Sequence, residues 1–242
     1  GLHHGTYIKI GNDLNIERKQ DKEENMDFLD KRVGVICNEL KKLKVKQVFP
    51  LTQWEYKEGN FIHPEDALKD EAAWENFDCK TMHWYGKDRH YWFRTTYTVP
   101  EELDGKSIWI RVSSQIDEWD DGRNPQFIVF VNGEVYQGID MNHRECLITR
   151  SGKAGETLTI DLQAYTGIMH EEFALRTQIE EIDAEIEKLY YDLWVPLAAF
   201  SRMEADDKNR KDIEYVLNET INLLDLRTPY SEDFFRIVRE AS

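Results

Sequence analysis

Short segments in which hydrophobic and polar residues alternate fill most of the region between residues 91 and 162. The clearest of them places Ile108, Ile110 and Val112 on one face and Trp109 and Arg111 on the other. A period of two is typical of a half-buried β-strand, and several short strands separated by turns indicate an antiparallel β-sandwich. The expected strands are residues 91–99, 108–112, 127–131, 133–136, 146–148 and 158–162.

A tight turn connects two of these segments in the stretch NPQFIVFVNGEVYQG, residues 124–138. Asn132 and Gly133 stand between two strand-like runs, and this dipeptide is the strongest short-range signal for a β-hairpin. A type I′ turn requires positive φ at both central residues, which asparagine and glycine tolerate best. We therefore predict a two-residue hairpin with Asn132 and Gly133 at its tip.

Helical periodicity flanks the expected strands on both sides. Before them, apolar residues from Leu29 to Leu43 are spaced by alternating gaps of four and three, which is one stripe on a helix of about five turns. After Gly167 the same spacing returns and predicts another helix, which Pro196 is expected to kink or end. The apolar face of this second helix comprises Leu175, Ile179, Ile182, Ile186 and Leu189.

A further helix is expected beyond Pro196, capped by Asp206 or Asp207. Its inward residues are expected to be Ile213, Val216, Leu217, Ile221 and Leu224. A last short helix is predicted near Ser231, where a serine cap is followed by acidic residues. The pattern as a whole predicts an α+β protein. Its expected segments are a polar tail (1–25), an N-terminal helix (26–45), a β-sandwich with an irregular lead-in (46–168) and a helical segment (169–242).

The chain is strongly acidic, with 47 Asp and Glu residues against 31 Lys and Arg residues and a formal net charge of −16. Such a charge repels phosphate backbones and anionic lipid, so we expect neither nucleic acid nor a membrane as a partner. No apolar stretch approaches the roughly 18 residues that span a bilayer, and the N-terminus lacks the apolar region of a signal peptide. Cys37, Cys79 and Cys146 are widely spaced, which favours buried free thiols and a cytoplasmic protein.

No catalytic motif is recognisable in the sequence. It contains neither a phosphate-binding glycine loop nor a Gly-x-Ser-x-Gly nucleophile elbow, and it lacks His-Glu-x-x-His. Pairs such as His-x-His and His-x-Asp, which supply two metal ligands from one strand, are also absent. With 47 acidic residues, no particular pair of carboxylates can be singled out. We predict no catalytic residue, no metal ligand and no cofactor in this chain.

Two polar loops are the candidate binding elements. The first, DEWDDGRNPQ at 117–126, is rich in the oxygen ligands that calcium prefers, but its spacing does not follow an EF-hand and a solvated loop is the alternative. The second, GIDMNH at 138–143, combines planar polar groups with nearby aromatic rings, as a sugar site does, with loop-stabilising Asx turns as the alternative. The candidate sugar contacts are Trp119, Asp120, Asn124, Gln126, Asp140, Asn142 and His143.

Four segments occur along the chain in the order HYWFRTTYTVPEEL, NPQFIVFVNGEVYQGIDMNH, YYDLWVPL and LNETINLLDLR. This succession resembles the N-terminal region of the α-mannosidases of glycoside hydrolase family 38, and most of all their cytosolic and bacterial branch. The most specific part is Asn-Pro-Gln, then Asn-Gly, then Gln-Gly-x-Asp-x-Asn-His. The resemblance runs from about Leu29 to the C-terminus.

The resemblance implies a jelly-roll, galactose-binding-like β-sandwich that precedes a zinc-dependent, retaining catalytic domain. The zinc motif and the nucleophilic aspartate of that family have no counterpart in this sequence, so no catalytic or metal-binding residue is carried over. The implied function is that of an accessory domain that is inactive alone. Its implied partners are its own downstream catalytic domain, which would hold the zinc, and a mannose-containing glycan for the whole enzyme.

Two other functions fit the same residues. A stand-alone carbohydrate-binding module would use the candidate sugar contacts directly, with weak affinity because a shallow site buries little of its ligand. A structural or oligomerisation domain would use the apolar stripes of residues 26–44 and 175–189 to form a homo-oligomer. Such stripes more often pack on the core of their own domain.

Overall fold

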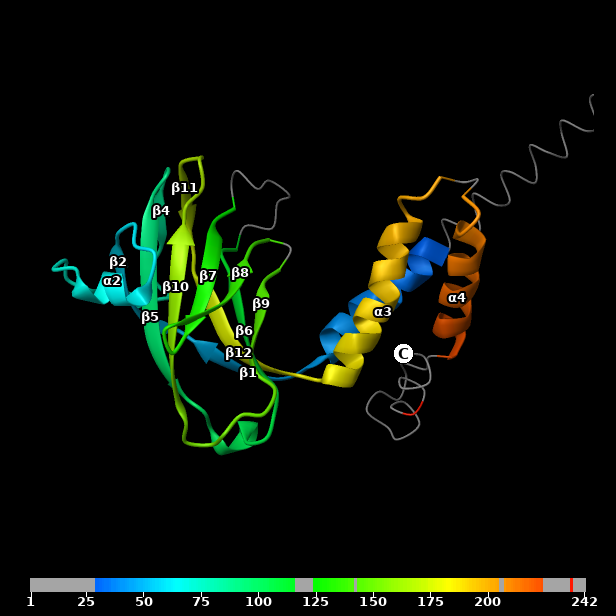
Figure 1. The fold of residues 1–242 in the computed structure, drawn as a ribbon, viewed down its shortest axis with the longest axis horizontal. Helices are drawn as coiled ribbons and strands as arrows, with labels where there is room; N and C mark the ends of the chain where they lie inside the picture. Colours follow the sequence, from blue (N-terminus) through cyan, green and yellow to red (C-terminus); the bar gives the residue numbers. More distant parts are fainter. Residues whose placement is uncertain (1–28, 116–123, 142, 205–206, 224–235, 237–242) are drawn as a thin grey trace, which may run out of the picture. The chain divides into compact units, whose positions relative to one another are not determined.

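The computed structural model describes residues 29–115, 124–141, 143–204, 207–223 and 236, which fall into two compact units (Figure 1). One unit is the β-rich segment Val45–Asp183. The other unit is helical and combines the described residues up to Lys44 with those from Ala184 onward. The chain therefore has the α+β class that the sequence predicts.

Two antiparallel sheets make up the β-rich unit. The larger sheet has six strands in the order β3-β2-β5-β10-β7-β8, and the smaller has four in the order β1-β12-β6-β9. Strands β11 and β4 form a separate two-stranded ribbon. The larger sheet consists of β2 (Gln53–Glu58), β3 (Glu75–Asp78), β5 (His90–Thr98), β7 (Gln126–Val131), β8 (Glu134–Ile139) and β10 (Thr157–Tyr165). The other strands are β1 (Val45–Leu51), β4 (Trp84–Gly86), β6 (Ile108–Ser113), β9 (Glu145–Thr149), β11 (Glu171–Phe173) and β12 (Arg176–Ile182).

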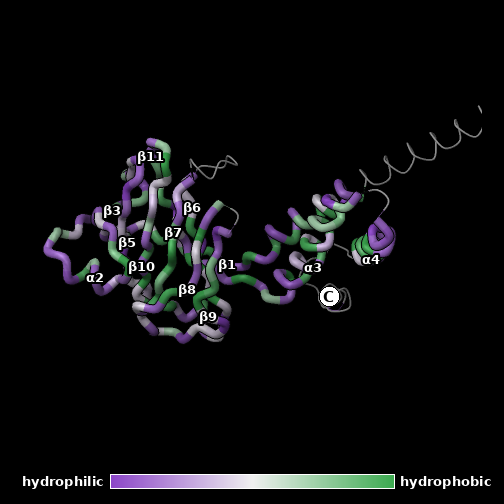
Figure 2. Tube along the Cα trace, turned by 45° about the horizontal axis from the view of Figure 1, so that its top comes forward, coloured by the Kyte–Doolittle hydropathy of each residue, from purple (hydrophilic) through white to green (hydrophobic). Residues whose placement is uncertain are grey.

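Side chains from both sheets meet in one hydrophobic core, which confirms the predicted sandwich. Ile108, Ile110 and Val112 of β6 face this core and are almost fully buried, as their alternation predicts. Phe93 of β5 and Leu162 of β10 reach it from the larger sheet. Figure 2 shows apolar segments along the strands and more polar ones in the connections. All the strands predicted between residues 91 and 162 form, as β5 to β10.

The β7–β8 hairpin turns at Asn132 and Gly133, whose φ angles are 51° and 85°. Both are positive, as the predicted type I′ turn requires. Asn132 also fastens the tip of the hairpin to β10. Its backbone N donates to the Thr159 carbonyl over 2.8 Å, and its side-chain Oδ1 accepts a hydrogen bond from the Thr159 backbone N over 2.9 Å.

The lead-in to the sandwich is regular, which corrects the expectation of irregular structure. Strands β1 to β4 lie there, together with the short helix α2 (Pro64–Lys69). Ala67 of α2 covers Trp92 and Phe130 on the outer face of the larger sheet. A 3-10 turn, η1 (Glu101–Leu103), follows β5. The sequence signal is weak here because β1 and β3 are edge strands, and β1 alternates mainly between exposed and half-buried residues.

Residues 169–182 are the main departure from the expected helical segment. They contain β11 and β12, and β12 lies between β1 and β6 in the smaller sheet. Helix α3 (Ala184–Phe200) begins only after Asp183, so the sandwich extends to residue 183 instead of 168. The helix predicted from Leu175 onward is therefore wrong over its first half.

Thr177 explains why the sequence of β12 does not show a clear strand-like alternation. It takes the inward position between Leu175 and Ile179, so a polar residue interrupts the apolar face of the strand. Its hydroxyl accepts a hydrogen bond from Trp54 Nε1 over 2.9 Å and donates to the Leu51 carbonyl over 2.7 Å. A buried hydroxyl satisfied in this way is tolerated in a core, although the sequence pattern reads as helical.

The helical unit has one apolar cluster of its own. Its helices within the described residues are 29–43, α3 (Ala184–Phe200) and α4 (Arg210–Leu223). Val33 and Leu40 of the first helix are fully buried with Leu189 of α3 and Leu217 of α4, which confirms the predicted stripe. The stripe of the first helix therefore packs inside the chain, on Leu189 of α3 and Leu217 of α4. Leu175 and Ile179 of the second predicted stripe belong to the core of the sandwich instead. The homo-oligomer stays a prediction.

Details of α3 and α4 differ from expectation. Pro196 lies inside α3 and does not end it. In α4, Ile213, Leu217 and Ile221 face the cluster as predicted, whereas Val216 is 57% exposed. The Asp207 carboxylate accepts a hydrogen bond from the backbone N of Asn209 just before α4 begins. Several predicted features lie outside the described residues: the 1–25 tail, Asp206, Leu224 and the helix near Ser231.

Helices of the described ranges are too short or too polar to cross a membrane.

Candidate functional site

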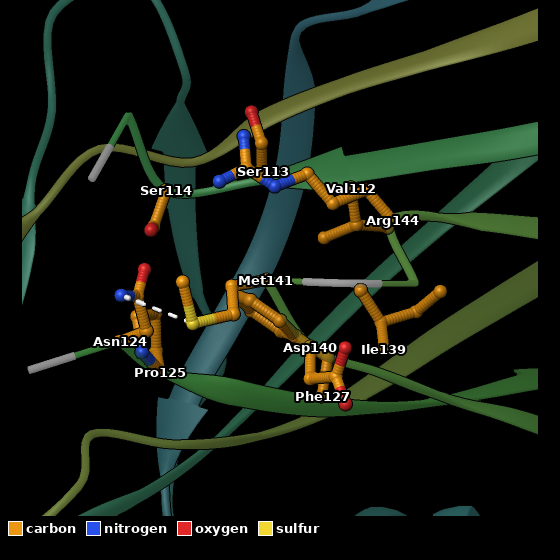
Figure 3. Close-up of a pocket in the computed structure, with 10 residues that line it drawn as sticks. All are labelled: Val112, Ser113, Ser114, Asn124, Pro125, Phe127, Ile139, Asp140, Met141 and Arg144. Carbon is orange, nitrogen blue, oxygen red and sulfur yellow. Dashed lines mark hydrogen bonds between the residues drawn. The ribbon is translucent and has the colours of Figure 1, made fainter. Parts of the chain in front are cut away.

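The β7–β8 hairpin brings described residues of the two predicted polar segments to one end of the sandwich. Asn124 precedes β7 and Asp140 follows β8, and the antiparallel register sets Phe127 opposite Ile139. The residues that flank the open end of the hairpin are therefore neighbours. Figure 3 shows them around a small hollow, with Met141 between Asn124 and Asp140.

The described part of this hollow is narrow. Its volume is about 10 Å³, which is room for about one water molecule. Asn124 is 5% exposed, and its side-chain Nδ2 lies 4.0 Å from the sulfur of Met141. Ser113 and Ser114 also contribute to the lining. A space of this size does not admit a sugar ring, so sugar contact at this place is limited to its outer edge.

His143 and Asp140 form a local turn at that edge. The backbone N of His143 donates to Asp140 Oδ1 over 2.8 Å, and its ring Nδ1 lies 3.2 Å from the same oxygen. The side chain of His143 is 70% exposed. This side-chain-to-backbone hydrogen bond stabilises the loop, as the sequence-based alternative to sugar contact expects, but it spans three residues and not the two of an Asx turn. The imidazole stays accessible.

Of the remaining predicted contacts, Gln126 is described and is exposed at the start of β7. Trp119, Asp120 and Asn142 lie outside the described residues, as does most of the 117–126 loop considered for calcium. Within the described ranges, no three His, Cys, Asp or Glu side chains come together as a metal site requires. Calcium binding by the 117–126 loop stays a prediction.

A larger hollow, of about 460 Å³, opens at the same end of the larger sheet. It lies where β2 ends and β5 begins, next to β4. Because β10 pairs with both β5 and β7, His90, Tyr165 and Gln126 stand in a row along this end. Roughly 14 Å, or three strand spacings, separates the two hollows across the sheet.

Aromatic and charged side chains surround the larger hollow, which we call the Tyr85 pocket. Its lining includes Tyr56, Lys57, Glu58, Glu75, His83, Trp84, Tyr85, Arg89 and Tyr91. The Arg89 guanidinium lies 3.6 Å from the Glu58 carboxylate, and the ring of Tyr85 is 55% exposed. The Tyr91 hydroxyl donates to the Tyr85 carbonyl over 3.0 Å. Burial raises the pKa of Tyr91, which keeps this hydroxyl protonated at neutral pH.

The Tyr85 pocket is absent from the sequence-based site prediction. Glu58 reaches Arg89 only because β2 pairs with β5, and Tyr85 joins them only because β4 and β11 form a ribbon. The one local signal is the stretch HWYGKDRHYW, residues 83–92, where aromatic and charged residues crowd around Gly86. This local signal predicts a turn, but it does not indicate which other strands lie next to that turn.

The three cysteines take no part in either hollow. Cys37, Cys79 and Cys146 are free and buried, as predicted. Burial raises the pKa of each thiol to about 11. At neutral pH these thiols are therefore protonated and poor nucleophiles.

Comparison with known proteins gives only distant likenesses. No protein-family model and no curated protein sequence matches the chain. A β-glucuronidase from Ruminococcus gnavus in complex with D-glucuronic acid superposes with a TM-score of 0.38 at 12% identity, over 57% of this chain and 30% of that chain. The same enzyme in complex with C6-substituted uronic isofagomine gives a TM-score of 0.38 at 13% identity, over 58% and 30% of the two chains. Similarity this low supports no functional assignment, and the chain matches less than a third of either glucuronidase chain.

Proposed function

We propose that the chain is the N-terminal accessory domain of an α-mannosidase of glycoside hydrolase family 38. The whole enzyme would hydrolyse terminal α-D-mannosyl residues of mannan or N-glycans. The proposal rests on the ordered resemblance of four segments, and one structural observation carries it furthest. The most specific of those segments forms the single hairpin β7–β8, whose open end puts Asn124 and Asp140 in the lining of one small hollow of an antiparallel sandwich.

In this proposal the chain is inactive alone. Retaining glycoside cleavage requires two carboxyl groups about 5–5.5 Å apart around the scissile bond. Asp140 is the single carboxylate among the described lining residues of the small hollow, which is also too narrow for a sugar ring. The zinc and both catalytic carboxylates would therefore belong to a downstream catalytic domain. Asn124, Asp140 and His143 would at most lie at the edge of its active site.

The proposed setting is the cytoplasm, which the three buried free thiols favour. The net charge of −16 makes nucleic acid and anionic membranes poor partners. The partners that we propose are the downstream catalytic domain and, through it, a mannose-containing glycan.

Hydrolysis of p-nitrophenyl α-D-mannopyranoside with added zinc tests this function. We expect no turnover by residues 1–242 and zinc-dependent turnover once the downstream coding sequence is restored. In the restored enzyme, His143→Ala should raise KM more than it lowers kcat, because an edge residue contacts substrate remote from the reacting bond. Robust zinc-dependent hydrolysis by residues 1–242 alone would show the accessory-domain proposal to be wrong.

A further inference from the structure

We propose that the Tyr85 pocket binds a neutral hexopyranose unit of a glycan, with Glu58 and Arg89 as its hydrogen-bonding pair and the ring of Tyr85 as its platform. The proposal is independent of the mannosidase assignment, because it rests only on described side chains of the sandwich. The pocket volume of about 460 Å³ lies within the roughly 300–1,000 Å³ typical of small-ligand sites.

Glu58 and Arg89 place two planar polar groups side by side. Arg89 Nη1 lies 3.6 Å from Glu58 Oε2, and the two side chains are 47% and 53% exposed, so much of their hydrogen-bonding capacity faces solvent. A carboxylate accepts two or more hydrogen bonds, and a guanidinium donates several in one plane. Neighbouring hydroxyls of a pyranose can donate to Glu58 and accept from Arg89 at the same time.

Tyr85 supplies an aromatic face next to this pair. In β4 it points away from the buried Trp84, and its ring is 55% exposed. Its backbone is fixed by the hydrogen bond from Tyr91, which itself stacks on Tyr56 with ring centroids 6.3 Å apart and 18° between the ring planes. An exposed aromatic ring beside planar polar groups suits the C–H face of a sugar ring.

The turn that carries Arg89 is held in place before any ligand arrives. Asp88 has φ 54°, in the left-handed region that non-glycine residues adopt rarely and often at ligand sites. Its carboxylate accepts a hydrogen bond from the Tyr165 hydroxyl over 3.0 Å, and its backbone N donates to the Gly167 carbonyl over 2.8 Å. The backbone N of Arg89 donates to Thr166 Oγ1 over 2.9 Å. Little ordering of the backbone is therefore required on binding, which favours affinity.

Gly86 gives the Arg89 side chain its position. Its φ is 149°, and a Cβ atom built there would come within 2.5 Å of Arg89 Cδ. The arginine stem therefore lies directly across the glycine backbone. A Gly86→Ala variant should displace the guanidinium without removing any polar group of the pocket. It also strains the backbone, because alanine rarely adopts φ 149°.

The lining carries a surplus of negative charge. Arg89 is paired with Glu58, and Lys57 is paired with Asp70, whose Oδ2 lies 3.1 Å from its Nζ. Glu75 adds a further carboxylate. Such a lining disfavours a uronate or a phosphate, so a neutral polyhydroxyl ligand fits better than either.

Calorimetric titration of the chain tests the proposal, with the methyl glycosides of α-mannose, β-glucose and β-galactose as ligands and D-glucuronate as the charged comparison. We expect saturable binding of at least one methyl glycoside, with Kd on the order of 1 mM. Tyr85→Ala, Glu58→Gln and Gly86→Ala should each weaken it by about tenfold or more. Tyr136→Ala is the matched control, because Tyr136 is a tyrosine of β8 exposed to 45%.

Thermal melts establish whether each variant is folded. If Tyr85→Ala is unfolded, the conservative variant Glu58→Gln decides the test. The proposal is overturned if none of the three methyl glycosides gives saturable binding. It is also overturned if Glu58→Gln and Gly86→Ala bind the ligand with the same affinity as the unchanged chain. Tighter binding of D-glucuronate than of any neutral glycoside also overturns it. Loss of binding in Asp140→Ala, with binding retained in Glu58→Gln, would place the sugar at the small hollow and contradict the proposal.

Discussion

Asp161 is a buried carboxylate on the outer face of the larger sheet. It lies between Ile160 and Leu162, which face the core, so its own side chain points outward. The residue is 1% exposed, and neither carboxylate oxygen has a hydrogen-bond partner among the described residues. Arg94 Nη1 is 3.6 Å from Oδ1. Burial raises the pKa of Asp161 to about 6, against the opposing effect of the Arg94 guanidinium.

A carboxyl group whose pKa is higher in the folded state lowers stability once it ionises. Asp161 therefore has no effect on stability below pH ~4, progressively lowers stability between pH ~4 and ~6, and exerts its full effect above that range. The difference in free energy of unfolding between Asp161→Asn and the unchanged chain should therefore increase, in favour of the variant, by on the order of 2 kcal/mol from pH 4.5 to pH 7.5. Urea denaturation at both pH values measures this.

Glu156→Gln is the control for the Asp161 experiment, because Glu156 is an exposed carboxylate next to the start of the same strand. The difference in free energy of unfolding between Glu156→Gln and the unchanged chain should change by less than about 0.5 kcal/mol over the same pH range. A difference between Asp161→Asn and the unchanged chain that does not vary with pH would contradict the assignment.

At the scale of elements, the β7–β8 hairpin contains two glycines with different roles. Gly133 has φ 85° at the turn, and a Cβ there would meet no atom within 4 Å. Gly138 lies in β8, where a Cβ would make an ordinary contact of 3.9 Å with the Phe127 carbonyl. The cost of replacing Gly133 is therefore purely conformational, and Gly138 has no such constraint.

Gly133→Ala should lower the free energy of unfolding by about 1 kcal/mol, because a left-handed conformation is strained for alanine. Gly138→Ala, the matched control in the same hairpin, should change it by less than about 0.5 kcal/mol. Thermal or urea denaturation of both variants measures the difference. Equal losses would mean that the turn conformation does not set the cost.

The elements that could be predicted from sequence are those whose signal is local. The hairpin at Asn132 and Gly133 and the strands β5 to β10 combine alternation with turn residues inside a short window. Strand β12 could not be predicted, because Thr177 takes an inward position and its hydrogen bonds to β1 and β2 have no local signature. The candidate site divides in the same way. Asn124 and Asp140 line one hollow through a single hairpin. Glu58 and Arg89 meet through the pairing of β2 with β5, which no short window reveals.

At the scale of the whole molecule, both hollows open at one end of the larger sheet, on either side of the end of β10. The small hollow holds the residues that resemble the mannosidase segment, and the Tyr85 pocket holds the proposed sugar-binding pair. Three strand spacings, or roughly 14 Å, separate a glycan in the pocket from the small hollow. One branched glycan could therefore contact both.

Both units carry a buried thiol, so thiol reactivity reports on the whole chain. Cys37 belongs to the helical unit, and Cys79 and Cys146 belong to the sandwich. Because burial raises each pKa to about 11, we expect DTNB at pH 8 to react at least about 100-fold more slowly with the folded chain than with the chain in guanidinium. Denaturation should release all three thiols, and rapid reaction of the folded chain would show that a cysteine is accessible.

The chain enters the sandwich at Val45 and leaves it next to Ile182, and these two residues are paired across β1 and β12. The helical unit is thus interrupted in sequence by the entire sandwich, since residues 29–43 lie before it and α3 and α4 follow. During synthesis on the ribosome, the apolar face of the first helix cannot pack on Leu189 and Leu217 until every strand of the sandwich has been translated. At about 5–20 residues per second that delay is on the order of 10 s, long enough for a chaperone to engage the nascent N-terminus before its own partners exist.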